Sequence, residues 1–240
     1  MNLISKHNLA YALIPFKRNQ DVIKIRPGKD EVKFTVAVVD GWNWIEKIPG
    51  HKVGRQVAEF VANKYPELFL TSKEKNWQTR AENTALIIDR QVIKQWPVFA
   101  SCVGVFLFGL EKYNLIVFIG KAVVLVRNRK KWFKPKQIGD YSDQETDPNF
   151  TSDVSHFIGR SELKKFPHFS AKPDVAMVPK ERPIFIATDG LEDLFTAKEF
   201  NQITHNWHLE NPEDFLHRLL EEIQKRKTRQ KDDISILIKA

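Results

Sequence analysis

Three acidic positions stand beside apolar runs that are typical of buried strands. Asp40 follows the run FTVAVV, Asp189 follows IFIAT, and Asp232 comes two residues before ISILI. A buried strand holds a carboxylate rigidly at the rim of its sheet, and neighbouring rims bring like charges together. Because like charges repel at close range, such a cluster needs a proton or a cation. With no His or Cys nearby in the sequence, oxygen ligands favour a hard ion such as Mg²⁺ or Mn²⁺.

A simpler interpretation of the same residues is a set of turns. Asp40-Gly41 and Asp189-Gly190 each match the commonest signal for a short turn after a strand. The pair Asp232-Asp233 can simply cap a strand. Gly41 also fits a metal site, because a residue without a side chain lets its carbonyl approach an ion. Composition and spacing alone leave both interpretations open.

The elements that position these residues indicate an α+β domain with largely antiparallel sheets. Helical patterns precede and follow a central group of strand-like runs, and the strict alternation of a Rossmann fold is absent. The predicted strands are Leu9–Pro15, Val32–Val39, Val98–Phe108, Tyr113–Ile119, Ala122–Arg127, Pro183–Ala187 and Ile234–Ile238. The predicted helices are Lys52–Tyr65, Asn76–Gln95 and one that begins at Pro212 after the N-cap Asn211. Residues 141–153 are predicted to form a loop.

Length, hydropathy and cysteine content narrow the class of protein. The 240 residues suit one large domain, and the 17 Phe and 6 Trp argue against a disordered chain. The apolar runs are too short to span a bilayer and residues 1–15 show no signal peptide. We therefore expect a cytoplasmic protein without membrane association. The single cysteine, Cys102, excludes an internal disulfide and is interpreted as a core residue.

The net charge of +8 is concentrated in two basic clusters, Arg127–Lys136 and Lys225–Lys231. We interpret both as solvated surface, the first as a hairpin turn and the second as the end of a helix. Neither comes with zinc-finger spacing or an RNA-binding aromatic motif, so no nucleic-acid partner is predicted. A nucleic-acid binder that uses the first cluster is the weakest alternative function, and it predicts strongly salt-dependent binding.

The order of short motifs along the chain resembles the metal-dependent PPM/PP2C family of serine/threonine protein phosphatases, in its compact bacterial form. Each motif is weak by itself, and their order and spacing over about residues 8–239 carry the resemblance. The matching segments are Arg18–Asp21 (RNQD), Val38–Gly41 (VVDG), Gly50–Gly54 (GHKVG), Phe118–Gly120 (FIG) ahead of Ala122–Leu125, Ser155–Gly159 (SHFIG), Ala187–Leu194 (ATDGLEDL) and Lys231–Ile236 (KDDISI).

The resemblance implies a four-layer αββα sandwich, formed by one domain over residues 1–240, with a two-metal site that binds Mn²⁺ or Mg²⁺. By position, Asp40 would bridge both ions, and Asp189 and Asp232 would complete the ligands of the first. Asp21 and the carbonyl of Gly41 would serve the second ion. By itself Asp21 is typical of a solvated loop acid. The catalytic residues implied by the resemblance are Asp40, Asp189 and Asp232.

The implied reaction is hydrolysis of phosphoserine or phosphothreonine by a metal-activated water, without a phosphoenzyme. The implied partners are a phosphoprotein substrate and a serine/threonine kinase, in bacterial signalling. We expect the chain to act as a monomer.

The chain departs from the family pattern at three places. Lys121 stands where the family has an aspartate that supports a third metal, so we expect two ions. Phe16 stands where the family usually has a phosphate-binding arginine, which leaves the phosphate-binding residue unidentified, with Lys17 or Arg18 as alternatives. Trp42 and Trp44 replace glycines, and we expect them to pack in the core. These departures support a second hypothesis: a pseudophosphatase that binds a phosphoprotein or a partner without turnover.

Overall fold

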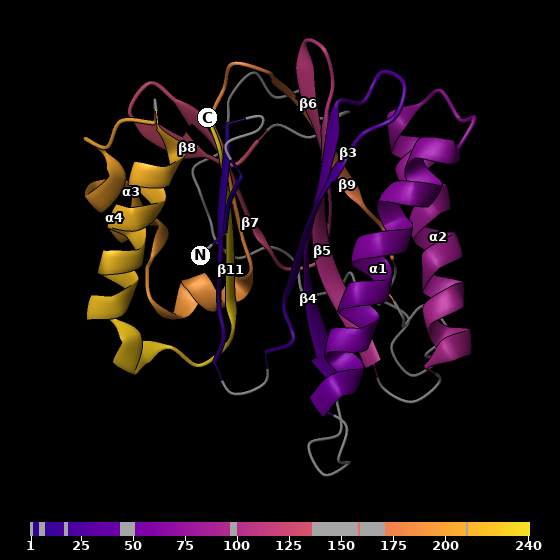
Figure 1. Cartoon of the computed structure of the whole chain (residues 1–240), viewed down its shortest axis with the longest axis horizontal. Helices are drawn as coiled ribbons and strands as arrows, with labels where there is room; N and C mark the ends of the chain where they lie inside the picture. The colour runs from indigo at the N-terminus through magenta and orange to yellow at the C-terminus, as the bar shows by residue number, and fades with distance from the viewer. Residues whose placement is uncertain are drawn as a thin grey trace.

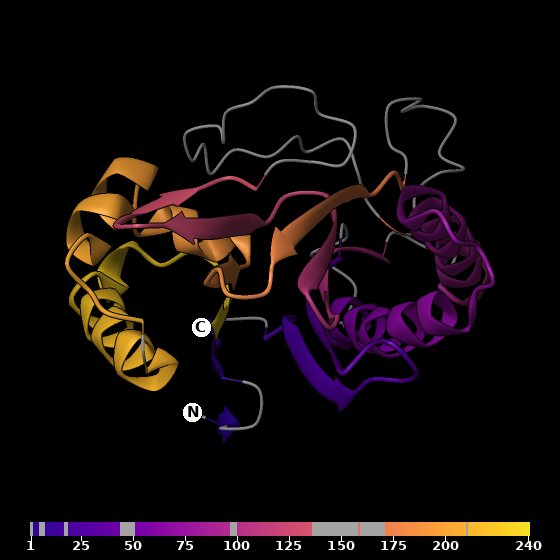
Figure 2. The same ribbon diagram turned by 90° about the horizontal axis from the view of Figure 1, so that it is seen from above.

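The computed structural model describes residues 2–4, 8–16, 19–43, 51–96, 100–135, 158, 171–209 and 211–240. Two antiparallel sheets stack face to face, with one pair of helices on each outer side (Figure 1). The view from above shows the same four layers, with the helices at the two flanks and the strands between them (Figure 2). The predicted αββα sandwich is confirmed.

The first sheet has six strands in the order β1-β2-β11-β10-β7-β8, and every neighbouring pair is antiparallel. Its strands are β1 (Asn2–Ile4), β2 (Leu9–Ile14), β7 (Val123–Asn128), β8 (Lys131–Phe133), β10 (Ile184–Ala187) and β11 (Ile234–Lys239). The second sheet has five antiparallel strands in the order β3-β4-β5-β6-β9. These are β3 (Val22–Pro27), β4 (Phe34–Asn43), β5 (Ala100–Gly109), β6 (Tyr113–Ile119) and β9 (Asp174–Pro179).

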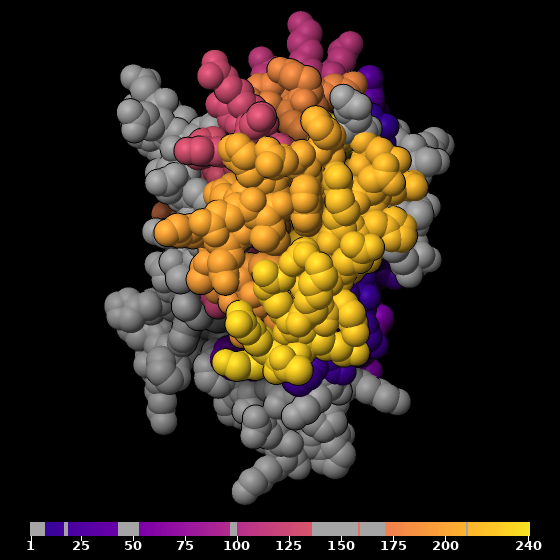
Figure 3. Space-filling model, turned by 90° about the vertical axis from the view of Figure 1, so that its left-hand side faces the viewer, coloured from indigo at the N-terminus to yellow at the C-terminus, as the bar shows by residue number. Residues whose placement is uncertain are grey.

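Helices α1 (His51–Thr71) and α2 (Trp77–Gln95) cover the five-stranded sheet, while α3 (Ala197–Thr204) and α4 (Pro212–Lys225) cover the six-stranded sheet. The side view shows α3 and α4, in orange and yellow, forming the surface over that sheet (Figure 3). Two short 3₁₀ helices, η1 (Asp189–Asp193) and η2 (Lys227–Arg229), complete the described elements. No helix in the described residues is long and apolar enough to cross a membrane.

Side-chain caps begin the helices where the sequence places them. Asn76 accepts a hydrogen bond from the amide of Thr79 at 3.0 Å, and Asn211 accepts one from Glu213 at 3.0 Å. Helix α1 is longer than predicted, because it continues through Pro66 to Thr71. The turn after Pro66 buries Phe69 completely. The free energy gained by this burial offsets the loss of the backbone hydrogen bond that a proline cannot donate.

Three apolar layers hold the sandwich together. One lies between the two sheets, and the other two lie between each sheet and its helices. The interpretation of Cys102 as a core residue is confirmed, since it is a free and buried thiol on β5. Burial raises the pKa of this thiol well above its usual value, so the group stays protonated and inert.

Two sequence interpretations need correction. The basic cluster Arg127–Lys136 does contain the predicted hairpin turn, between β7 and β8, and Arg129, Lys130 and Lys131 are exposed. Arg127, however, is only 8% exposed and Trp132 is fully buried, because the β7–β8 hairpin packs under α3. Trp42 is 37% exposed on β4, where we expected a core residue, because it lies near the end of that strand. Trp44, the predicted loop at 141–153 and most of the SHFIG segment lie outside the described residues.

Candidate active site

Antiparallel pairing brings Asp21 next to Asp40. In the β3–β4 pair, Val22 lies opposite Val39, so the residue before β3 and the residue after Val39 meet at the same end of the sheet. Asp21 is 1% exposed, although its position in a loop suggested a solvated acid. The segment that carries it is fixed by helix α1, whose Arg55 donates to the carbonyl oxygens of Asn19 at 3.0 Å and Asp21 at 3.3 Å.

The same geometry in the other sheet brings Asp189 near Asp232. Strand β10 pairs with β11 so that Ala187 lies opposite Ile236. Asp189 follows β10 and Asp232 precedes β11, so both stand at one end of the six-stranded sheet. Each sheet therefore supplies two of the four aspartates.

Thr188 joins the two pairs across the space between the sheets. Its hydroxyl donates to Oδ2 of Asp21 at 2.8 Å. The hydroxyl oxygen of Thr188 also accepts from the backbone amide of Ser235 at 2.9 Å. A hydroxyl can donate one hydrogen bond and accept others, so one side chain serves β10, β11 and the start of β3. The sequence pattern gave Thr188 no role in the site, although it stands directly before Asp189.

Asp233 is a second residue that the sequence analysis assigned only to a strand cap. It is 2% exposed, and its carboxylate accepts from the amides of Phe16 at 2.5 Å and Gln20 at 2.6 Å. These bonds tie the start of β11 to the connection between β2 and β3. Asp232, its neighbour in the chain, is exposed and accepts from the amide of Asp233 at 2.8 Å. The two acids therefore differ, since one is a buried anchor and the other stands at the rim.

The four aspartates interact electrostatically. Burial, together with the charges of Asp21, Asp189 and Asp232, raises the pKa of Asp40 well above its usual value. Burial and the charge of Asp233 raise the pKa of Asp21 to about 7, against the hydrogen bond from Thr188. Partial burial of the carboxyl group, followed by the charge of Asp189, also raises the pKa of Asp232. The residues that the sequence singled out thus form one repelling cluster.

Lys121 is the cation that contacts this cluster. Its ammonium lies 3.4 Å from Oδ2 of Asp189 and 2.7 Å from Oε2 of Glu192. Burial lowers the pKa of Lys121, but the hydrogen bond to Glu192 and the charges of both acids outweigh it, so the net shift is upward. Lys121 is therefore charged and partly neutralises Asp189.

Gly41 has a structural reason for lacking a side chain. A Cβ at this position would lie 2.1 Å from the carbonyl oxygen of Gly54, so helix α1 could not pack against β4. Phe16, at the position where the family pattern has a phosphate-binding arginine, is 39% exposed. The alternative phosphate-binding residues, Lys17 and Arg18, lie outside the described residues.

Within the described part of the chain, no group of three or more His, Cys, Asp or Glu side chains is arranged to hold a metal ion. The chemistry of the donors nevertheless fits a hard cation. All four side chains are carboxylates, which are the ligands that hard cations prefer. A divalent cation bound between them would compensate their mutual repulsion. The Asp cluster, defined as Asp21, Asp40, Asp189 and Asp232, is therefore the candidate site.

Solved structures with this architecture match almost the whole chain. A variant of a bacterial serine phosphatase matches with a TM-score of 0.67 at 15% identity, over 98% of this chain and 99% of its own. The serine/threonine phosphatase Stp1 from Staphylococcus aureus matches with a TM-score of 0.65 at 17% identity, over 100% and 97%. The fold is that of the bacterial PP2C-type serine/threonine phosphatases.

Another structure with this fold is the catalytic domain of the serine/threonine phosphatase PstP, which was solved in complex with two manganese ions. It matches with a TM-score of 0.61 at 12% identity, over 96% of each chain. No protein-family model matches the sequence, and no curated protein is similar to it in sequence. The chain therefore shares the fold of these phosphatases at 12–17% sequence identity.

Proposed function

We propose that this chain is a Mn²⁺- or Mg²⁺-dependent phosphatase that hydrolyses phosphoserine or phosphothreonine in proteins. The observation that carries the proposal is the charge environment of Asp40, whose pKa is raised by burial and by the charges of three other aspartates from both sheets. A bound cation is the usual way to compensate such repulsion between carboxylates. The PP2C-type fold and the two manganese ions in PstP support the same assignment.

In this proposal each aspartate takes the role that its motif suggests. Asp40 would bridge two ions, with Asp189 and Asp232 as further ligands of the first. Asp21 and the carbonyl of Gly41 would serve the second. The bound ions would supply an activated water at neutral pH and neutralise phosphoryl charge.

The remaining residues of the site keep these ligands in place. Thr188 holds Oδ2 of Asp21, and Arg55 holds the backbone on either side of Gln20. Both carboxylate oxygens of Asp233 accept hydrogen bonds from backbone amides, so we assign it no role as a metal ligand. We propose that these residues act as positioning groups, because none of them needs to contact the substrate.

The substrate class, partners and organisation belong to the same proposal. A phosphoprotein made by a serine/threonine kinase would be the substrate, in bacterial signalling in the cytoplasm. The 240 residues would act as one monomeric domain.

The decisive experiment compares turnover of a phosphothreonine peptide with Mn²⁺ by the parent chain and by Asp40→Asn. We expect the parent to turn over, and Asp40→Asn to lose about 100-fold or more, because it removes the charge that both ions share. Asp30→Asn is the matched control, since Asp30 is exposed in the β3–β4 turn, and it should keep full activity. Equal turnover by all three proteins, or none by the parent, would refute the proposal.

The ion pair between Lys121 and Asp189 favours a second candidate, the pseudophosphatase. If Lys121 takes the place of a metal, calorimetry with Mn²⁺ should detect little or no binding to the parent chain, while partner binding persists. The variant Lys121→Ala should then bind Mn²⁺ several-fold more tightly, because it frees Asp189. Binding of two ions per parent chain would instead support the phosphatase.

A further inference from the structure

A cavity of about 640 Å³ lies at the opposite end of the six-stranded sheet from the Asp cluster. Its lining includes Pro183, which precedes β10, whereas Asp189 follows that strand. It also includes Asn8, before β2, and Ala240, after β11. The length of the strands therefore separates this cavity from the candidate active site. Its volume is within the range of small-molecule sites.

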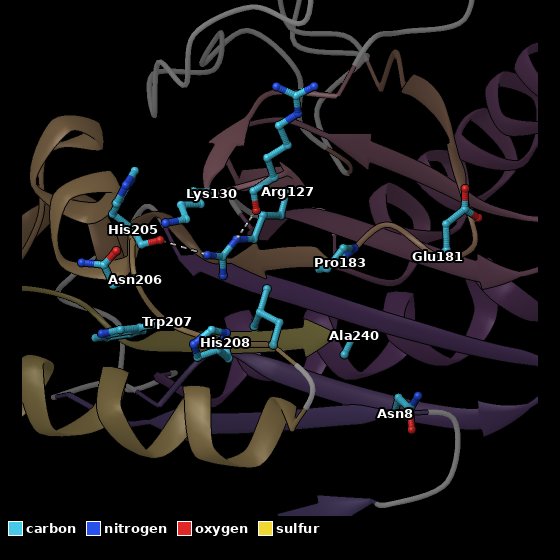
Figure 4. Close-up of a pocket in the computed structure, with 12 residues that line it drawn as sticks. Asn8, Arg127, Lys130, Glu181, Pro183, His205, Asn206, Trp207, His208 and Ala240 are labelled. Carbon is cyan, nitrogen blue, oxygen red and sulfur yellow. Dashed lines mark hydrogen bonds between the residues drawn. The ribbon is translucent and has the colours of Figure 1, made fainter.

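The lining of this cavity is basic. Arg127, Arg129 and Lys130 come from the β7–β8 hairpin, and His205 and His208 come from the segment after α3. The one acidic side chain among the described lining residues is Glu181, which lies at the other end of the cavity from His205 (Figure 4). The hairpin end of the cavity therefore attracts anions.

Arg127 is the buried member of this set. Its Nε donates to the carbonyl of Arg129 at 3.1 Å, and one terminal nitrogen donates to the carbonyl of His205 at 3.2 Å. Its other terminal nitrogen, Nη1, is buried without a hydrogen-bond partner in the described residues. Figure 4 shows the two bonds of the guanidinium and its third nitrogen pointing toward the side where His208 lies.

Nothing in the described part of the chain neutralises the Arg127 guanidinium. Its polar contacts are all carbonyl oxygens, and its ring contact is Trp132, whose centroid lies 5.7 Å away. Burial, with no compensating acid, lowers its pKa from the usual value. Since arginine stays protonated, this is a buried cation with a free donor, a costly arrangement that an anion relieves.

We propose that this cavity binds a small phosphate-bearing anion, held by Arg127 from the cavity wall and by Arg129 and Lys130 from its rim. Phosphate is favoured over a carboxylate for two reasons. Three cationic side chains match a dianion better than a single charge, and the fork of a guanidinium matches phosphate oxygens. The imidazoles of His205 and His208 add further donors. This site is independent of the proposed phosphatase activity.

The first test titrates pyrophosphate into the full chain by calorimetry, in EDTA and at constant ionic strength. Without divalent ions the Asp cluster repels the probe, so binding reports on the basic cavity. We expect saturable binding at one site, with a change in tryptophan fluorescence, because Trp207 lines the cavity and Trp132 lies under Arg127. Acetate in a parallel titration should bind at least tenfold more weakly.

Variants then locate the site. Arg129→Asn combined with Lys130→Gln changes only the exposed turn, and Asn tolerates the positive φ of 54° at position 129. We expect this variant to weaken pyrophosphate binding about tenfold or more. Lys73→Gln combined with Lys75→Gln removes the same charge from the exposed α1–α2 connection and should bind like the parent. Arg127→Lys, which keeps the charge and loses the fork, should also bind about tenfold more weakly.

Three outcomes would overturn the proposal: no saturable binding, equal affinity of the parent and the turn variant, or acetate binding as tight as pyrophosphate. Asp40→Asn separates this test from the proposed function, because it should keep the affinity of the parent for pyrophosphate. An inactive chain that still binds pyrophosphate at this cavity would refute the phosphatase proposal alone.

Discussion

Asp21, just before β3, and Asp40, in β4, lie at the same end of the paired strands, and neither has a cation next to it among the described residues. Burial removes the water that would solvate their charges, so a proton or a metal ion must compensate. Among the described residues, Lys121 pairs with Asp189 and Glu192, which lie in η1 after a strand of the other sheet. The protonation of Asp21 is therefore coupled to the stability of the metal-free protein.

At the residue scale we predict that metal-free protein loses stability as the pH rises toward neutrality. The pKa of Asp21 is raised from 3.8 to about 7, so the folded state binds this proton more tightly than the unfolded chain. Its stabilising contribution is complete below about pH 4 and is lost as the pH rises through about 7. Asp21→Asn, which keeps an acceptor for Thr188, should match the parent near pH 4.5 and melt at least about 3 °C higher at pH 8.

The measurement is the melting temperature in EDTA across this pH range. Asp30→Asn controls for the loss of one negative charge, because Asp30 is exposed, and it should follow the parent at every pH. A difference between Asp21→Asn and the parent that does not change with pH would contradict the prediction.

At the element scale, interior strands were predictable from the sequence and edge strands were not. All seven predicted strands have neighbours on both sides in their sheet, and their apolar runs reflect that burial. The four missed strands, β1, β3, β8 and β9, are the edges of the two sheets. Edge strands carry charged or exposed residues that keep them from pairing further, and this weakens the strand pattern.

Thr188 is the contact that joins these elements at the site. We predict that Thr188→Val, which keeps the shape and removes the hydroxyl, costs about 1–3 kcal/mol in the free energy of unfolding. It leaves the buried amide of Ser235 without its side-chain acceptor and Asp21 without its donor.

Urea unfolding measures this cost, and Thr188→Ser is the control that retains the hydroxyl. A free energy of unfolding for the valine variant within about 0.5 kcal/mol of the serine variant would show that the hydroxyl does not hold the sheets together.

At the scale of the whole molecule, one apolar layer is shared by both sheets. Residues of β4, β5 and β6 pack there against residues of β7, β10 and β11. Neither sheet can keep this face buried alone, because the outer faces are already covered by helices. The two halves of the sandwich should therefore unfold together.

We predict that the protein unfolds in a single transition. One substitution in the shared layer should therefore lower the melting temperature of the whole protein. Leu107 is fully buried between the sheets, so Leu107→Ala should cost about 3 kcal/mol and lower the melting temperature by about 6–12 °C. Circular dichroism and tryptophan fluorescence should give coincident curves. Leu86→Ala is the matched control, because Leu86 is 43% exposed on α2. Two separate transitions would contradict the shared core.

The sequence by itself indicated the interior strands, the main helices and three of the four aspartates, Asp40, Asp189 and Asp232. These features follow from local signals, namely apolar runs, capping residues and acids placed beside buried strands, whereas Asp21 was indicated only by the order of the family motifs. Local signals are enough where a residue's own neighbours in the chain dictate its role, as they do for the buried Cys102 and for Asn76, which caps the start of α2.

Only the tertiary structure decided which polar groups meet. Asp21 resembled a loop acid, Arg127 resembled solvated charge and Asp233 resembled a strand cap, yet all three are buried. Their partners come from distant parts of the chain: Thr188 for Asp21, the segment after α3 for Arg127, and the β2–β3 connection for Asp233. Burial and hydrogen bonding across sheets depend on how strands pair and stack, and no short stretch of sequence carries that information.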